Sequence, residues 1–331
     1  MKKSWILVLA LCLVLLTASA GAAGKVMLYS SMQEAQLQAV KEGFEAKYPH
    51  ITMDYYFASG GKVITKMSTE AQAGQIEADL VWLGDPSDYE SFKAAGYLAP
   101  YTSPETEHIP AAYSDPDGYY TAARLVTMGI AWCTLPGIGI PDEDAPKTWQ
   151  DLLDPKWKDQ LIMTDPAQSS TSKYWMAALM QNPAYGEAYF TALRDNGLQL
   201  ESGTTATHNV VAAGSYQVGI CLDYVSASLM AEGSPMNFHY TDSDVVTMTS
   251  PIGMIANSAN PDNAKILYDY ILSKEGQEIL VANNLVSVRD DVDSNGLDTG
   301  ALAAKNTAVD FNDLAENTGN YLDAFNTIFN K

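Results

Sequence analysis

Basic residues are scarce in this chain: its 331 residues include 19 Lys and Arg against 40 Asp and Glu, a formal net charge of −21. So acidic a surface argues against nucleic acid and against anionic membranes as partners, because both are negatively charged themselves. The net charge says nothing about a pocket, where a few local donors can outweigh distant, screened carboxylates.

Cysteine is also rare, with only Cys12, Cys133 and Cys221 in the chain. Cysteine and histidine nowhere show the spacing of a metal site, so the sequence predicts no metal and no cofactor. Cys133 and Cys221 stand in strand-like runs (GIAWCT and VGICLDY), which favours buried free thiols. An oxidising compartment would also permit a bridge between them, and this alternative stays open.

Long hydrophobic runs are absent beyond the first residues. There, Lys2-Lys3 precedes the apolar stretch Trp5–Leu16 and the small residues Ala18–Ala20, a pattern that predicts a cleaved signal peptide over residues 1–23. The stretch is shorter than the roughly 20 residues that cross a bilayer. We therefore expect an exported protein, periplasmic or extracellular.

The whole chain is 47% hydrophobic and 18% charged, an ordinary globular balance. Apolar strand-like runs at Lys25–Tyr29, Ile51–Phe57 and Ala78–Leu83 are each followed by a polar loop and a helical pattern. The same order returns at Leu161–Thr164 and Val218–Leu222. Strand, loop and helix in repetition predict an α/β fold with parallel strands and right-handed crossovers.

Two extended apolar segments, Tyr119–Thr134 and Val245–Ile255, separate these units. We interpret them as crossings between two lobes, each a mainly parallel sheet flanked by helices. The expected limits are residues 24–124 with 252–290 for lobe 1, 125–251 for lobe 2, and 291–331 for a helical tail that packs on the lobes, preferentially on lobe 2. In such sheets ligands bind at the carboxyl edges of the strands, so the cleft between the lobes is the expected site.

Hydroxyls and glycines crowd the loops at these edges. Backbone N–H groups at a helix start lack partners and carry positive dipole, so this composition suits a bound anion. The alternative for each position is an ordinary helix cap or turn. The candidates are Ser30, Ser31, Ser59, Gly60, Gly61, Ser169, Ser170, Thr171 and Ser172.

Acidic and aromatic residues form a second set, expected to bind the remainder of the ligand: Asp85, His208, Asp223 and Tyr224. Arg124, Lys62, Lys173 and Trp82 are secondary candidates. Each has a structural alternative: a cap for Asp85 and Asp223, a core role for His208 and Trp82, a solvated charge for Lys62 and Lys173, and an ion pair for Arg124.

Four stretches resemble a known family: ADLVWLGDPSDYESFKAAGYLAPY, PKTWQDLLDPKWKDQLIMTDP, VAAGSYQVGICLDY and GSPMNFHYTDSDVVTMTSPIGMIANSANPDNAKILYDYILSKEGQEIL. They are similar to extracellular solute-binding proteins of ABC importers, in the branch that binds ferric ion, phosphosugars or aminoethylphosphonate. The resemblance implies a two-lobed, two-crossing clamp that binds a small molecule, closes, and delivers it to the transmembrane subunits of a permease. It implies a monomer without catalysis.

The ferric members of this branch typically bind iron with adjacent tyrosines, where this chain has Tyr224-Val225. They often add a His, where it has Ser30-Ser31-Met32-Gln33, and a Glu, where it has Leu83-Gly84-Asp85. Ferric iron requires several hard anionic ligands, so it becomes the second choice. A phosphorylated small anion is preferred. A polyamine or thiamine-like cation, and an exported hydrolase that pairs His208 with a cleft serine, remain alternatives.

Overall fold

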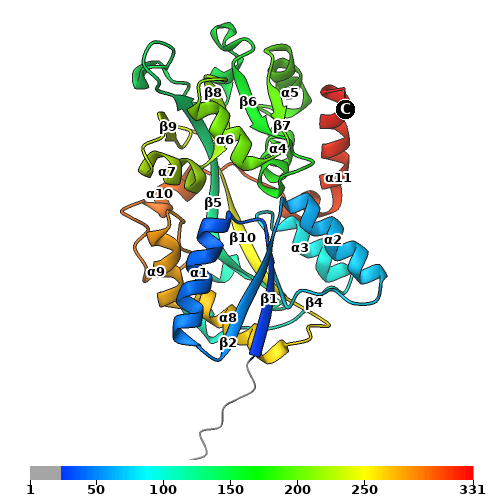
Figure 1. Ribbon diagram of the computed structural model, residues 1–331. Helices are drawn as coiled ribbons and strands as arrows, with labels where there is room; N and C mark the ends of the chain where they lie inside the picture. The colour runs from blue at the N-terminus through cyan, green and yellow to red at the C-terminus, as the bar shows by residue number, and fades with distance from the viewer. Residues whose placement is uncertain (1–23, 331) are drawn as a thin grey trace, which may run out of the picture.

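The structure is a computed structural model and describes residues 24–330. The predicted signal peptide, residues 1–23, therefore lies outside the described residues. Two lobes stand one above the other, joined by two long strands (Figure 1). No helix in residues 24–330 is long and apolar enough to cross a membrane.

Parallel strands form the core of each lobe. In lobe 1, β1 (Gly24–Ser30) lies between β2 (Ile51–Phe57) and β3 (Leu80–Trp82). In lobe 2, β6 (Leu161–Thr164) lies between β7 (Gln199–Glu201) and β8 (Val218–Leu222). The predicted α/β class with mainly parallel sheets is confirmed.

A single sheet nevertheless runs through both lobes, in the order β2-β1-β3-β10-β5-β8-β6-β7. The antiparallel pair β5 (Tyr120–Cys133) and β10 (Val246–Ile255) connects the two parallel parts. Two short strands flank this pair: β4 (Leu98–Ala99) against β10 and β9 (Met236–His239) against β5. The two crossings therefore lie side by side as one hinge.

Helices begin directly after the strands, as the sequence predicts. Lobe 1 carries α1 (Glu34–Lys47), α2 (Gly60–Gln72), α3 (Ser87–Ala94), α8 (Pro261–Leu272) and α9 (Lys274–Ala282). Lobe 2 carries α4 (Ser170–Gln181), α5 (Gly186–Asp195), α6 (Thr204–Ala212) and α7 (Asp223–Ala231). Helix α1 illustrates why these segments form helices. Its apolar residues Leu37, Val40 and Phe44 recur at helical spacing, and all three are buried.

The hinge contains a β-bulge. Arg124 pairs with Ser250 and Leu125 with Thr249, but the register shifts so that Ala122 pairs with Pro251. One extra residue in β5 bends the strand at the level where the lobes meet. Neighbouring residues of an extended strand point to opposite faces, so Arg124 and Leu125 face opposite sides of the hinge.

The C-terminal tail passes behind the hinge and ends on the side of lobe 2 (Figure 1). It contains the short helix α10 (Thr299–Ala304) and the long helix α11 (Phe311–Ile328). Helix α11 lies against α4 and α5, where the rings of Phe190 and Phe325 are 5.6 Å apart, and it also contacts α3 of lobe 1. The tail thus touches both lobes; the exact domain limits expected from the sequence stay a prediction.

Candidate functional site

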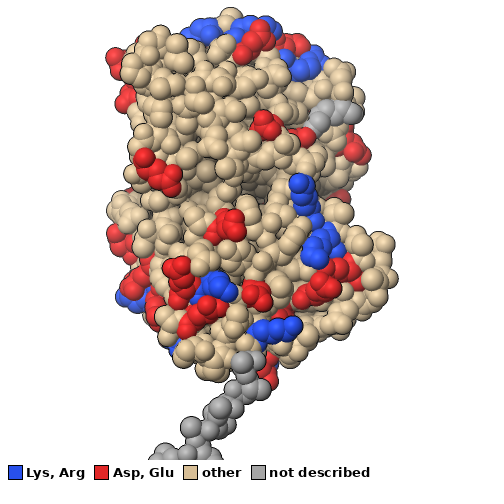
Figure 2. All heavy atoms as spheres, in the orientation of Figure 1, with Lys and Arg blue, Asp and Glu red and all other residues tan. Residues whose placement is uncertain are grey.

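A small cavity of about 30 Å³ lies between the lobes, at the carboxyl ends of the parallel strands. The space-filling view shows this face hollowed between the lobes, with mostly uncharged atoms around the hollow (Figure 2). Both lobes and the hinge line the cavity, through Ser31, Ser59, Gly60, Arg124, Gln168, Ser169, Ser170, Thr171, Thr204, Leu222 and Tyr224. Seven of the residues predicted to bind ligand, together with Arg124, therefore meet at one place.

Arg124 is the only charged residue that lines this cavity. Its side chain is 2% exposed, and its guanidinium lies 4.7 Å from the ring centre of Tyr224 and 5.7 Å from that of Trp82. Nε donates to Ser250 Oγ at 3.2 Å, whereas Nη1 has no hydrogen-bond partner among the described residues. A buried cationic donor is thus left with unused hydrogen-bonding capacity.

Two hydroxyl groups are also buried without a hydrogen-bond partner in the described part of the chain. Ser59 Oγ, at the N-terminus of α2, and Ser170 Oγ, at the N-terminus of α4, are buried without a hydrogen-bond partner among residues 24–330. The Ser170 hydroxyl lies beside the carboxyl group of Asp88 and acts to lower the pKa of that group. Two helix N-termini, one from each lobe, therefore face each other across the cavity with free polar groups.

The hydroxyl groups of the neighbouring Ser169 and Ser30 form hydrogen bonds with backbone groups. Ser169 caps α4 by accepting from Ser172 N at 3.3 Å, and its hydroxyl is 3.0 Å from that of Thr171. Ser30 Oγ donates to Trp82 O at 2.9 Å and accepts from Met32 N at 3.1 Å. Neither Ser30 nor Ser172 lines the cavity.

An ionic cluster joins the lobes beside the cavity. Lys173 Nζ of lobe 2 pairs with Asp85 Oδ2 at 3.2 Å and with Asp88 Oδ1, both carboxylates of lobe 1. Burial raises the pKa of Asp88 to about 6. Burial acts to lower the pKa of Lys173, but the charges of Asp88 and Asp85 outweigh it and raise that pKa above its ordinary value.

Asp85 is also a cap, because its Oδ1 accepts from both the backbone N and the Oγ of Ser87, at 2.8 and 2.6 Å. The structure thus places Asp85 and Lys173 in a contact between the lobes, outside the cavity lining. Further hydrogen bonds cross the interface, from Thr205 Oγ1 to Gln33 Oε1 at 2.9 Å and from Gln36 Nε2 to Ser228 Oγ at 3.2 Å. The lobes are therefore closed on each other.

His208 is held by the backbone. Its Nδ1 is 2.8 Å from Thr204 O and its Nε2 accepts from Leu222 N at 3.0 Å, so the neutral ring carries its proton on Nδ1. Burial lowers its pKa. The ring has no nitrogen left for a ligand, and it does not line the cavity.

Asp223 is likewise engaged. It accepts from Thr127 N at 3.1 Å and from Tyr224 N at 2.7 Å, which ties the start of α7 to the hinge strand β5. Burial raises the pKa of this carboxyl group to about 7. Gly61 packs against Ala167 O, Trp82 is fully buried, and Lys62 is exposed; none of the three lines the cavity.

The lining also contains Gln168, Thr204 and Leu222, which sequence reasoning did not name, and Arg124, which it named as a secondary candidate. A single arginine within the otherwise apolar run Tyr119–Thr134 was the available signal, because a charge in such a run must be paired or functional. Within the described residues, one group has the spacing for a metal ion: the exposed His108, Asp290 and Asp291, outside this cavity.

Comparison with known proteins gives a consistent result. A family model described as bacterial extracellular solute-binding protein matches residues 25–283. An uncharacterized protein of Haemophilus influenzae is 28% identical over 271 residues, which is 79% of this chain and 76% of that protein.

Solved structures share the fold. The periplasmic binding protein AfuA from Actinobacillus pleuropneumoniae, with fructose-6-phosphate bound, superposes with a TM-score of 0.78 at 24% identity, over 93% of this chain and 97% of that one. A ferric binding protein from Campylobacter jejuni gives 0.75 at 23% identity, over 92% and 99%. At these identities the likeness concerns the two-lobed fold and leaves the ligand open.

Proposed function

Since the chain belongs to the family of bacterial extracellular solute-binding proteins, we propose that it captures a small phosphorylated organic anion, such as a sugar phosphate or a phosphonate. It is the substrate-binding component of an ABC importer, so its second partner is the transmembrane permease. Closure of the lobes over the ligand would create the form that the permease recognises.

The observation that carries the proposal is the set of three buried donors without partners: Arg124 Nη1, Ser59 Oγ and Ser170 Oγ. They come from the hinge, lobe 1 and lobe 2 and face the same cavity. Each buried unsatisfied group costs about 1–3 kcal/mol, so a partner that serves all three would stabilise the closed form strongly. A phosphoryl group offers several acceptor oxygens in a tetrahedral arrangement and favours a guanidinium as donor.

The helix N-termini add to this preference. Ser59 is the N-cap residue of α2 and Ser170 the first residue of α4, so the positive ends of both dipoles point at the cavity. In this closed form the cavity of about 30 Å³ has room for one small group, so the hydroxyl and amide groups of Ser31, Gln168 and Thr204 would bind the organic part once the lobes stand further apart. The bound fructose-6-phosphate of AfuA supports the same ligand class.

A ferric ion is less well served. Tyr224 is the one phenol in the lining, and no carboxylate joins it there. Ferric iron requires several hard anionic ligands, whereas the three unpartnered groups are donors. A polyamine fits this cavity less well than an anion, because Arg124 would repel it.

Titration calorimetry on the chain without its signal peptide tests the proposal. We expect heat of binding from at least one of fructose 6-phosphate, glucose 6-phosphate, 2-aminoethylphosphonate and 3-phosphoglycerate, and none from fructose or spermidine. Arg124→Gln should weaken binding by about 10- to 150-fold, the equivalent of 1.5–3 kcal/mol for a charged hydrogen bond.

Lys265→Gln is the matched control, because it removes a half-exposed positive charge on α8 without touching the cavity. Equal affinity for fructose and its phosphate, or unchanged affinity in Arg124→Gln, would refute the phosphoryl assignment. A charge-transfer colour after iron loading would favour the ferric alternative.

A further inference from the structure

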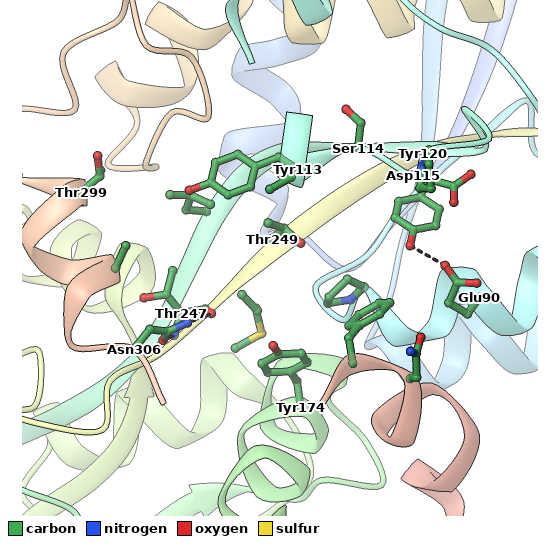
Figure 3. A pocket seen from close by; sticks show the side chains of 18 of the residues that line it. Glu90, Tyr113, Ser114, Asp115, Tyr120, Tyr174, Thr247, Thr249, Thr299 and Asn306 are labelled. Atoms are coloured by element: carbon green, nitrogen blue, oxygen red, sulfur yellow. Dashed lines mark hydrogen bonds between the residues drawn. The ribbon is translucent and has the colours of Figure 1, made fainter. Parts of the chain in front are cut away.

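A second and larger cavity of about 690 Å³ lies behind the hinge, and we call it the rear pocket (Figure 3). Its walls come from five parts of the chain: α3, the segment 112–116, the hinge strands, α4 and the tail. Representative residues are Glu90, Tyr113, Thr249, Tyr174, Leu302 and Phe311. Its volume falls within the range of about 300–1,000 Å³ that small-molecule sites occupy.

The rear pocket and the ligand cavity lie on opposite faces of the same two strands. Arg124 of β5 faces the ligand cavity and bonds Ser250 of β10, its cross-strand partner. The next pair, Leu125 and Thr249, lines the rear pocket. Leu125 and Thr249 thus place the rear pocket on the face of the hinge opposite to that of Arg124 and Ser250.

The chemistry of the rear pocket differs from that of the ligand cavity. Leu125, Met248, Leu302 and Phe311 give it an apolar body, to which Tyr113 and Tyr174 add aromatic faces. Figure 3 shows Thr299 and Asn306 at one end, and Glu90, Tyr120 and Asp115 at the other.

The end at Glu90 has an excess of negative charge. Glu90 Oε1 accepts from Tyr120 Oη at 2.6 Å, but no lysine or arginine of residues 24–330 forms an ion pair with this carboxylate. Lys93 also lines this end of the pocket, but its ammonium group is already shared between Asp115 at 2.9 Å and Asp117 at 2.7 Å. This end of the pocket therefore has room for a further cation.

We propose that the rear pocket is a second binding site, which takes a small organic amine with an apolar or aromatic body. The ammonium group sits at Glu90, and the body lies along Leu125, Met248 and Phe311. Aromatic rings near a desolvated ammonium group strengthen its binding. The anion cavity in front has the opposite charge preference, so the two sites do not compete for one ligand.

Occupation of the rear pocket favours closure of the cleft. The structure combines closed lobes with an open rear pocket, and lobe 1, lobe 2 and the tail all contribute to its walls. Rotation about the hinge that separates the lobes in front brings the walls behind it together. An amine that fits the closed form better than the open one shifts the lobes towards closure through this difference in affinity.

Binding is tested with four amines (2-phenylethylammonium, tyramine, cyclohexylammonium and hexylammonium) and the neutral 2-phenylethanol, by calorimetry without any anion. We expect saturable binding of at least one amine, at least tenfold tighter than that of 2-phenylethanol. Glu90→Gln should weaken the amine at least tenfold and leave the alcohol unchanged. Glu278→Gln, an exposed change on α9, should leave both unchanged. No saturable binding up to about 10 mM, or equal binding by wild type and Glu90→Gln, would overturn the site.

Coupling is tested by the distance between spin labels at Thr65→Cys on α2 and Asn209→Cys on α6, both exposed positions. The native Cys133 and Cys221 are fully buried, so labelling is confined to the introduced thiols. The amine alone should increase the population with the short distance, and Glu90→Gln should abolish the change. Amine binding without this change would overturn the coupling. Because no anion is present, both results are independent of the phosphoryl assignment in front.

Discussion

Gly84 offers a direct test of whether ligand binding needs the closed contact between the lobes. It follows β3 in lobe 1, and a Cβ atom there would lie 2.4 Å from Cγ2 of Thr171 in lobe 2, while Thr171 Cβ and N are both 3.7 Å away. The methyl group of Thr171 is therefore the only close obstacle in the described structure. Since the two residues belong to different lobes, Gly84→Ala should disturb the closed form alone.

The size of the effect follows from this overlap. Overpacking a well-packed contact by one carbon costs about 1–3 kcal/mol. If this cost falls on the closed state, affinity for the anion should decrease by about 5- to 150-fold. The free energy of unfolding without ligand should change by less than about 0.5 kcal/mol, because the open form contains no such contact.

Thr171→Ser provides the rescue. It removes Cγ2 but keeps the hydroxyl that lies 3.0 Å from Ser169 Oγ. Calorimetry should therefore show near wild-type affinity in the double variant Gly84→Ala/Thr171→Ser, and an interaction energy of the same size as the loss in Gly84→Ala. Wild-type affinity in Gly84→Ala alone, or no recovery in the double variant, would refute the assumption that the bound state has this closed contact.

Three further predictions concern other groups. Lys173→Met leaves Asp85 and Asp88 as neighbouring buried carboxylates, so anion affinity should fall at pH 7.5. The pKa of Asp88 is about 6 with Lys173 in place and rises further without it, so affinity should recover in part at pH 5; titrations at both pH values check this. Burial lowers the pKa of His208, so between its folded pKa and 6.5 the unfolded state binds more protons than the folded state. The free energy of unfolding should therefore decrease as pH falls through this range. Urea unfolding at pH 7.5 and 5.5 should show this decrease in wild type, and a smaller pH dependence in His208→Gln. Cys133 and Cys221 are unpaired and buried, so a thiol reagent should find two thiols per chain lacking its signal peptide only after unfolding, and rapid reaction in the native state would contradict the structure.

The sequence predicted the fold well, because strand, loop and helix follow each other with clear changes of period. It also predicted that loops distant in the chain meet, since parallel strands bring their carboxyl ends to one edge. Ser59, Gly60, Ser170 and Thr171 line one cavity for this reason.

The use of individual polar groups could not be predicted in the same way. Ser30, His208 and Asp223 have the composition of ligand groups, but their hydrogen bonds go to Trp82 O, Leu222 N and Thr127 N. These partners lie on other strands or loops, and their positions depend on register and side-chain rotamers that no local pattern encodes. Arg124 shows the converse, because only the bulge and the pairing with Ser250 direct it into the cavity.

Arg124 also explains how the ligand could drive closure. Closing the lobes buries its guanidinium almost completely, yet no carboxylate of the described residues forms an ion pair with it. Asp223 is near enough for its carboxyl group to feel this charge, but both of its oxygens are engaged by backbone N–H groups. A buried charge without a partner opposes closure, because desolvation is compensated only by an opposite charge and hydrogen bonds. A bound anion supplies the opposite charge and the hydrogen bonds for Arg124, and it also accepts hydrogen bonds from Ser59 and Ser170. The same three donors therefore disfavour the closed form without ligand and favour the closed form with ligand.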